Sequence, residues 1–215
     1  MRYKAIIFDL DGVICHTDHY HYLAWKQLAD RLEIEFNETI NNRLRGVSRM
    51  KSLEIILEKW KGEPFSEEEK SKLAEEKNEV YKELLQQMST MDLSDEVKET
   101  LEHLRRRGLL LAIGSSSKNT RIILGQIGLS DFFDAISDGN NITRSKPDPE
   151  VFLKAAEYLK MEPSDCLVIE DAKAGIDAAK AVGMDSAALG DAFGYSNATY
   201  DLFTFSKLIQ ICSAQ

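Results

Sequence analysis

Acidic residues directly follow two apolar runs of the sequence, which span residues 5–8 and 166–169. The acids are Asp9 and Asp11 after the first run, and Glu170 and Asp171 after the second. Carboxylates gathered in one place repel one another, and a hard divalent cation with oxygen ligands, Mg²⁺ above all, relieves that repulsion. A carboxylate in such a site can also attack phosphorus and form an aspartyl-phosphate. These acids are therefore candidates for metal-assisted phosphoryl transfer.

Hydroxyl and ammonium groups that suit a transferring phosphoryl group occur further along the chain. Ser115 begins a run of three serines after a third apolar segment, residues 109–113, and Lys146 precedes a proline. A phosphoryl group in transfer needs positive charge and hydroxyl donors around its oxygens. Each signal alone has an ordinary alternative: Asp-x-Asp forms turns, Glu-Asp can cap a helix, and a lysine before proline commonly lies in a surface loop. The order of the segments, each where a strand should end, favours the chemical interpretation.

Alternating apolar runs and amphipathic segments predict the elements that would bring these residues together. Short, continuous apolar runs are typical of strands buried on both faces of a parallel sheet. Helical periodicity occurs between these runs, over 95–107, 119–127, 149–159 and 172–182. Because the carboxyl ends of parallel strands share one edge of a sheet, residues at those ends can converge although they are far apart in sequence. The sequence therefore predicts an α/β fold, a parallel sheet with helices on both faces.

The segment 17–91 lacks a convincing strand and carries helical patterns instead. Ala24 and Leu28, one turn apart, share an apolar helical face. We therefore expect an all-helical cap domain at 17–91, inserted into an α/β catalytic core of 1–16 and 92–215. The two junctions of such an insert can act as hinges, which let a lid close over a site.

Composition and charge exclude several classes of protein. The 215 residues are 43% hydrophobic and 29% charged, which fits a sizeable core with a smaller insert rather than a disordered chain. A net charge of −9 argues against a nucleic-acid binder, because such proteins neutralise phosphates with basic surfaces. The apolar run after Met1 is too short for a signal peptide or a membrane span, and the three cysteines are widely spaced. We expect a cytoplasmic protein with neither nucleic acid nor membrane as partner.

The motif residues together resemble the four motifs of the haloacid dehalogenase-like hydrolase superfamily. The matching segments are Asp9-Leu10-Asp11-Gly12-Val13 with Thr17, then Ser115, then Ser145-Lys146-Pro147-Asp148-Pro149, then Glu170-Asp171. The resemblance implies a Rossmann-like core, Mg²⁺ as cofactor and Asp9 as the nucleophile. It also implies that Asp11 is the general acid/base and binds the metal through its backbone carbonyl. Glu170 and Asp171 would complete the metal site. Ser115 and Lys146 would be catalytic residues that contact the phosphoryl group.

The predicted helical insert resembles the cap of the β-phosphoglucomutase family. The residues that carry this resemblance are His21 with Ala24-Trp25, Gly46-Val47-Ser48-Arg49 with Ser52-Leu53, and Lys77-Asn78. In that family the cap binds one phosphate of a glucose bisphosphate while the core holds the other, and the resemblance assigns the cap phosphate to Arg49. His21 would be a catalytic residue that helps to position Asp11. The remaining expected substrate-binding residues are Trp25, Leu44, Gly46, Val47, Ser48, Ser52 and Lys77 in the cap, and Ser116, Ser117, Lys118 and Asn119 in the core.

Some of these residues also have ordinary interpretations. A helix arginine such as Arg49 is commonly solvated, and a helix tryptophan such as Trp25 commonly belongs to a core. A zinc site at His16, His19 and His21 is disfavoured, because no Cys or Glu partner has suitable spacing.

The resemblance implies a phosphomutase, an isomerase of carbohydrate metabolism that acts on a small sugar phosphate. It would interconvert β-glucose 1-phosphate and glucose 6-phosphate through an aspartyl-phosphate and β-glucose 1,6-bisphosphate. A sugar-phosphate phosphatase is the first alternative, in which water instead of a sugar hydroxyl attacks the aspartyl-phosphate. A catalytically inert binding module is the second, and the intact Asp9, Asp11, Lys146 and Asp171 argue against it. No apolar stripe demands a second subunit, so we expect a monomer.

Overall fold

The structure, a computed structural model, describes residues 2–44 and 47–213. The chain divides into two compact units, one formed by Met1–His16 with Ser89–Gln215 and the other by Thr17–Met88. We call the first the core unit and the second the helical unit. Gly46, one of the expected substrate-binding residues, lies outside the described part of the chain.

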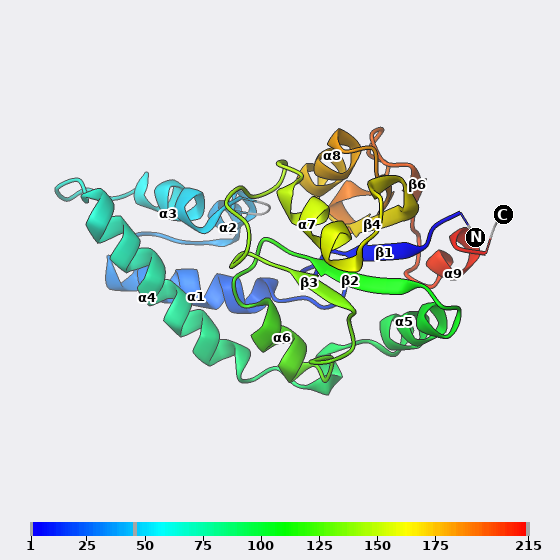
Figure 1. Ribbon diagram of the computed structural model, residues 1–215. Coiled ribbons are helices and arrows are strands. Elements are labelled where there is room, and N and C mark those ends of the chain that lie inside the picture. Colours follow the sequence, from blue (N-terminus) through cyan, green and yellow to red (C-terminus); the bar gives the residue numbers. More distant parts are fainter. Residues whose placement is uncertain (1, 45–46, 214–215) are drawn as a thin grey trace. The chain divides into compact units, whose positions relative to one another are not determined.

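The core unit is built on a parallel sheet of six strands (Figure 1). The strands are β1 (Ala5–Phe8), β2 (Leu110–Gly114), β3 (Ala135–Ser137), β4 (Cys166–Glu170), β5 (Asp185–Ala188) and β6 (Tyr200–Asp201). They lie in the order β3-β2-β1-β4-β5-β6, and every neighbouring pair is parallel. Ala5 of the central strand pairs with Leu110 on one side and with Cys166 on the other. The carboxyl ends of β1, β2 and β4 therefore lie side by side, as the sequence predicts.

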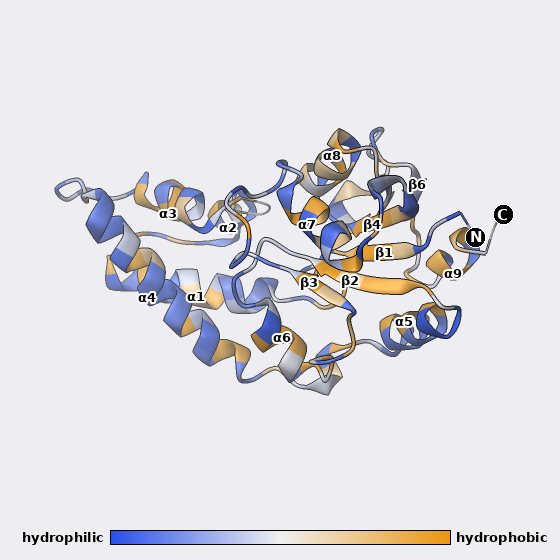
Figure 2. Ribbon diagram, viewed as in Figure 1, coloured by the Kyte–Doolittle hydropathy of each residue, from blue (hydrophilic) through white to orange (hydrophobic). Residues whose placement is uncertain are grey.

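Helices cover both faces of this sheet. α7 (Glu150–Leu159) and α8 (Lys173–Ala181) lie over one face, and α5 (Asp95–Arg106), α6 (Thr120–Gln126) and α9 (Lys207–Ile211) lie over the other (Figure 1). Short 3-10 turns occur at Thr90–Asp92, Pro163–Asp165 and Gly190–Ala192. The apolar residues concentrate in the inner strands (Figure 2), and all four residues of β1 are fully buried. The α/β fold class is confirmed.

The strands β3 and β5 do not correspond to any of the apolar runs recognised in the sequence. β3 has only three residues, and β5 reads Asp-Ser-Ala-Ala, with no β-branched or large apolar side chain. Both are placed by their neighbours in the sheet, since Ile136 pairs with Ile113 and Ser186 pairs with Val168. A strand defined by pairing in this way carries little signal in its own sequence.

The described residues of the helical unit form helices and no strand. The helices are α1 (Asp18–Arg31), α2 (Glu38–Asn42), α3 (Arg49–Leu57) and α4 (Glu67–Leu85). α4 begins with a capping box, in which Ser66 and Glu69 satisfy each other's backbone N–H groups. The unit has its own apolar core, to which Trp25, Leu28 and Leu53 belong. Within residues 2–44 and 47–213, no helix is long and apolar enough to cross a bilayer.

Gly114, the last residue of β2, has no room for a side chain. A Cβ atom there would lie 2.7 Å from Cδ1 of Phe152 on α7 and 3.0 Å from Cγ2 of Ile7 on β1. We expect Gly114→Ala to lower the free energy of unfolding by about 1–3 kcal/mol, although alanine is ordinarily favoured over glycine within a strand. Denaturant unfolding measures this loss. Adding Phe152→Leu should recover part of it, whereas two losses that simply add would show that crowding is not the cause.

Candidate active site

Buried side chains at the carboxyl ends of β1 and β4 gather around the ammonium of Lys146. This ammonium donates hydrogen bonds to Oδ1 of Asp9 and, at 2.6 Å, to Oε1 of Glu170. The side chains of Asp9 and Glu170 are both buried. The register of the sheet explains why they meet. Phe8 of β1 pairs with Ile169 of β4, and the residues that directly follow these two are Asp9 and Glu170. The structure thus brings together three predicted residues that are distant in sequence.

The loop before α7 presents Lys146 to these carboxylates. Oε2 of Glu150, at the start of α7, accepts hydrogen bonds from the backbone N–H groups of Thr143 at 3.0 Å and Arg144 at 2.8 Å. The bond from Thr143 is the largest reason that the pKa of Glu150 falls to about 2. The Lys146 ammonium also lies 4.7 Å from the centroid of the Phe152 ring. The side chain of Lys146 is therefore fixed by its contacts in the site and does not project freely into solvent.

Glu170, the last residue of β4, and Asp171, which follows it, both contact other segments. Oε2 of Glu170 accepts a 2.7 Å hydrogen bond from the backbone N–H of Ala172, just before α8. The N-cap residue of α8 is Ala172, and no side chain caps this helix, so the alternative of a helix-capping carboxylate is wrong for Glu170. Glu170 instead contacts both Lys146 and the backbone just before α8. The carboxylate of Asp171 lies directly against Gly12, where a Cβ atom would overlap with it. Asp171 thus approaches the segment that contains Asp11.

Burial and mutual repulsion disfavour the charged forms of these acids. Burial raises the pKa of Asp9, and the nearby Glu170 and Asp11 add to that rise, while Lys146 opposes it without cancelling it. Burial, followed by Glu170 and Asp9, likewise raises the pKa of Asp171. Burial acts to lower the pKa of Lys146, but Asp9 and Glu170 together raise it above its usual range. The site therefore holds a charged lysine and more carboxylates than that lysine can neutralise.

Such a set of oxygen donors fits a hard divalent cation. The candidate ligands are Asp9, Asp11, Glu170 and Asp171. Their electrostatic crowding is what a bound cation relieves, and carboxylate oxygens are preferred ligands of such ions. Within the described ranges, no three His, Cys, Asp or Glu side chains are already arranged to coordinate one ion together.

The serine-rich loop after β2 is ordered by its own hydroxyl groups. The backbone N–H of Ser115 donates to the carbonyl of Ser137 at 3.0 Å, which continues the pairing of β2 with β3. Ser115 Oγ accepts from the N–H of Ser117, and Ser117 Oγ accepts from the N–H of Asn119, each at 3.2 Å. Ser115 and Asn119 are buried, whereas Ser116 and Lys118 are exposed. This loop follows β2, and so it starts at the same sheet edge as Asp9.

Three predicted residues of the helical unit form a second cluster. The Lys77 ammonium lies 2.8 Å from Nδ1 of His21 and 4.7 Å from the centroid of the Trp25 ring. Lys77 is only 3% exposed and Trp25 is 4% exposed, so both are buried. The cluster combines a cation, an imidazole and an aromatic surface.

Arg49, at the start of α3, is half-buried and held by side chains of α4. Its Nη2 donates to Oδ1 of Asn78 at 2.8 Å, and its Nη1 lies 3.3 Å from Oε2 of Glu75. Burial lowers the pKa of Arg49, and the nearby Glu75 and Glu79 oppose that effect. Arg49 is therefore more than a solvated helix arginine. Glu75 is not predicted from the sequence, because nothing in its spacing marks it as a partner of Arg49.

The other expected residues of the helical unit divide by exposure. Ser48 and Val47 are exposed, and Ser48 caps α3 by accepting a hydrogen bond from the N–H of Lys51 at 3.3 Å. Leu44 and Ser52 are buried, and Leu44 belongs to the apolar core of this unit. Their expected contacts with substrate stay predictions.

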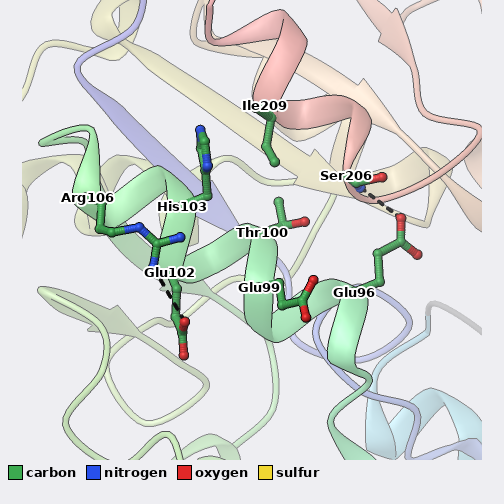
Figure 3. Close-up of a pocket in the computed structure, with 8 residues that line it drawn as sticks. All are labelled: Glu96, Glu99, Thr100, Glu102, His103, Arg106, Ser206 and Ile209. Atoms are coloured by element: carbon green, nitrogen blue, oxygen red, sulfur yellow. Dashed lines mark hydrogen bonds and ion pairs between the residues drawn. The ribbon is translucent and has the colours of Figure 1, made fainter.

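A pocket of about 290 Å³ lies elsewhere in the core unit, between α5 and the C-terminal segment (Figure 3). Its lining includes several carboxylates, two of which already have partners. Glu96 accepts from the N–H of Ser206 at 3.0 Å, and Glu102 lies 3.6 Å from Arg106. The lining contains none of the motif residues, so we place the chemistry at the Lys146 cluster.

Comparison with known proteins identifies the family. Residues 3–183 match the family model described as haloacid dehalogenase-like hydrolase. The chain belongs to the haloacid dehalogenase-like hydrolase family. Membership implies an enzyme that uses a divalent metal ion, which agrees with the donor set of the core unit.

Relatives within the haloacid dehalogenase-like hydrolases include both mutases and phosphatases. The chain is 42% identical over 188 residues to the β-phosphoglucomutase of Bacillus subtilis, which covers 87% of this chain and 83% of that protein. It is 30% identical to a phosphorylated carbohydrates phosphatase of Thermotoga maritima, covering 85% of this chain and 82% of the relative. The structure also matches a crystal structure of β-phosphoglucomutase from Clostridium difficile, with a TM-score of 0.88 and 38% identity, covering 98% of this chain and 96% of that one.

Gly175, inside α8, makes room for the Glu170 carboxylate. A Cβ atom at this position would overlap with Oε1 and Cδ of Glu170. We expect Gly175→Ala to displace Glu170 from Lys146 and to destabilise the fold by about 1–3 kcal/mol, although alanine is ordinarily the better helix former by about 1 kcal/mol. Thermal unfolding measures the loss of stability, and the rate of hydrolysis of a small aryl phosphate measures the effect of displacing Glu170.

Gly125→Ala is the matched control for this substitution. Gly125 lies inside α6, and a Cβ atom there would find only Ser130 Oγ, at 3.7 Å. The control should be neutral or stabilising. Equal changes in Tm and in turnover for the two alanine variants would show that contact with Glu170 is not the reason that glycine is needed at position 175.

Proposed function

We propose that this protein is a β-phosphoglucomutase, which interconverts β-glucose 1-phosphate and glucose 6-phosphate through an aspartyl-phosphate on Asp9 and β-glucose 1,6-bisphosphate. The similarity to β-phosphoglucomutases from two bacteria over most of the chain supports this proposal. A sugar-phosphate phosphatase with the same core chemistry is the alternative, supported by the relative from Thermotoga maritima.

Two cationic side chains of the helical unit, Lys77 and Arg49, favour the mutase over the phosphatase. Lys77 is almost fully buried among aromatic and imidazole groups, and Arg49 is half-buried. Burying a cation is costly, and the charge of a bound phosphate would add to the compensation that the present contacts of these two side chains provide. A mutase must hold the second phosphate of a bisphosphate, and a guanidinium can bind phosphate through two hydrogen bonds. A phosphatase of sugar monophosphates has no second phosphate to hold.

The core unit supplies the groups for phosphoryl transfer. An oxygen of Asp9 attacks phosphorus, and the bond between phosphorus and the sugar oxygen breaks, which leaves the phosphoryl group on Asp9. Lys146 favours the ionised form of Asp9 and offers positive charge to the phosphoryl oxygens, and the Ser115 hydroxyl can donate to one of them. Asp11 returns a proton to the departing sugar oxygen. In the opposite half-reaction Asp11 removes the proton of the attacking sugar hydroxyl.

We propose Mg²⁺ as the divalent ion, held by Asp9, Glu170, Asp171 and the backbone carbonyl of Asp11. When bound, Mg²⁺ neutralises charge on the carboxylates and on the phosphoryl oxygens. Burial, together with the neighbouring carboxylates, raises the pKa values of Asp9 and Asp171, and a cation at this place would favour their ionised forms.

We further propose that the protein works as a monomer in the cytoplasm. The three cysteines, Cys15, Cys166 and Cys212, are free and buried. Free thiols of this kind are typical of a reducing compartment.

A product assay separates the mutase from the phosphatase. β-Glucose 1-phosphate, Mg²⁺ and a trace of glucose 1,6-bisphosphate are supplied, and glucose 6-phosphate and free phosphate are followed together. We expect glucose 6-phosphate with little free phosphate, and Asp9→Ala should abolish turnover because it removes the nucleophile. One free phosphate for each sugar consumed would identify a phosphatase instead.

Arg49→Ala tests the assignment of the second phosphate. Loss of two charge-assisted hydrogen bonds should lower kcat/KM for the mutase reaction by roughly 100-fold, while hydrolysis of a small aryl phosphate, which has one phosphate, should change little. Arg43→Ala is the matched control, because Arg43 is an exposed arginine of the same unit that pairs with Glu58 at 2.8 Å. Equal losses in both reactions would contradict the role of Arg49.

Asp171→Asn tests the metal site by thermal unfolding. Because burial and neighbouring carboxylates disfavour the charged form of Asp171, its replacement by a neutral amide should raise the Tm of the metal-free protein. The same change should reduce the rise in Tm that Mg²⁺ produces, which is about 2–4 °C for each kcal/mol of binding free energy. An unchanged response of the variant to Mg²⁺ would remove Asp171 from the ligand set.

A further inference from the structure

Tyr81 of α4 contacts three functional groups of the helical unit at once. Its side chain is fully buried, and its hydroxyl donates a 3.0 Å hydrogen bond to Oγ1 of Thr17. Its ring stacks on the imidazole of His21, with centroids 4.0 Å apart and planes 18° from parallel. The ammonium of Lys77 lies 4.6 Å from the centroid of the same ring.

The spacing of these residues on two helices explains the arrangement. Lys77 and Tyr81 are four residues apart on α4, and Thr17 and His21 are four residues apart at the start of α1. Residues four apart lie on one face of a helix, so each helix presents a pair to the other. The backbone N–H of His21 donates to the carbonyl of Thr17 at 3.1 Å, which completes the first turn of α1.

The contact between Lys77 and His21 defines the proton position on the imidazole. An ammonium has only donors, so Nδ1 of His21, 2.8 Å away, must accept, and the ring proton then lies on Nε2. Burial, followed by the charges of Lys77 and Arg49, lowers the pKa of His21 well below its usual value. His21 is therefore a neutral imidazole with one defined donor.

The surroundings of Lys77 explain how this contact persists. The ammonium lies between the rings of Trp25 and Tyr81, at 4.7 and 4.6 Å from their centroids. Aromatic faces attract a cation, and the attraction is stronger when the cation is desolvated. The Tyr81 ring thus acts on both members of the His21–Lys77 pair, because it lies flat against one and faces the charge of the other.

A packing role alone does not account for this geometry. A buried aliphatic side chain would fill the same space, but it would neither set the plane of the imidazole nor attract the ammonium. The hydroxyl is also engaged, since it joins α4 to Thr17, the first residue of the helical unit.

We propose that Tyr81 is a positioning residue, whose ring holds His21 and Lys77 together so that His21 presents Nε2–H as a donor. This inference rests on the proposed function, in which His21 and Lys77 serve the sugar-phosphate reaction. It adds Tyr81 to the residues on which that reaction depends.

Two substitutions at this position test the ring and the hydroxyl separately. Tyr81→Leu removes the aromatic face, so we expect kcat of the mutase reaction to fall roughly tenfold or more. Hydrolysis of a small aryl phosphate should fall less than the mutase reaction, because the groups that contact phosphorus belong to the core unit. Tyr81→Phe keeps the ring and should keep most of the turnover. Ile56→Ala, which makes a cavity in the apolar core of the same unit, is the control for lost packing.

Ring-nitrogen NMR of labelled histidine gives a readout that packing alone does not move. The His21 signal of the wild type, Tyr81→Phe and Ile56→Ala should show one neutral form with the proton on Nε2 across neutral pH. Tyr81→Leu should show a mixture of the two neutral forms, or a ring that titrates in this range. If Tyr81→Leu does not fold, Tyr81→Met replaces it, because a thioether fills the space without a flat face.

A single Nε2–H form together with unchanged kcat in the folded Leu or Met variant would overturn the proposal. So would loss of that form in Tyr81→Phe or in Ile56→Ala, because the ring would then not be the cause. The NMR result stands even if the wild type shows no mutase turnover, so failure of the proposed function is distinguished from failure of this inference.

Discussion

An ammonium placed between two buried carboxylates is the interaction on which the proposed chemistry of the core unit depends. Lys146 contacts Asp9 and Glu170, and all three side chains are largely withdrawn from solvent. A nucleophilic carboxylate has to be ionised, and burial works against ionisation. Lys146 offsets part of that cost while bringing positive charge to the place where phosphoryl oxygens would lie. Losing one partner of such a buried pair commonly costs about 3–5 kcal/mol, so the same contact ties the chemistry to the stability of the sheet edge.

Site residues could be predicted from the sequence where an apolar run marks a buried strand and the parallel order of the sheet places the end of that strand. The run 5–8 and the run 166–169 are apolar enough to be recognised as buried strands, and parallel pairing then places Asp9 and Glu170 at one edge. β5 could not be predicted in this way, because its sequence Asp-Ser-Ala-Ala has no apolar run and forms a strand by pairing with β4. The fold class was within reach of the sequence, whereas the full strand order needed the structure.

Side-chain partners are harder to predict than the residues that they serve. Arg49 can be recognised through its resemblance to a family position, but Glu75 has no comparable signal. Gly175 looks like a weak helix former until the Glu170 carboxylate is seen against it. Tyr81 reads as an ordinary core residue, and its parallel contact with His21 depends on how α1 and α4 pack. These roles are set by tertiary contacts that sequence periodicity does not contain.

The chain enters the helical unit after His16 and leaves it at Met88. All of the phosphoryl-transfer candidates lie outside this stretch: Asp9 and Asp11 come before it, and Ser115, Lys146, Glu170 and Asp171 come after it. The residues proposed to contact phosphorus and those proposed to bind the second phosphate thus lie in separate stretches of the sequence. Grafting one contiguous cassette from a relative could therefore exchange the substrate range while leaving the reacting groups untouched, which gives a simple evolutionary route between mutases and phosphatases on one scaffold.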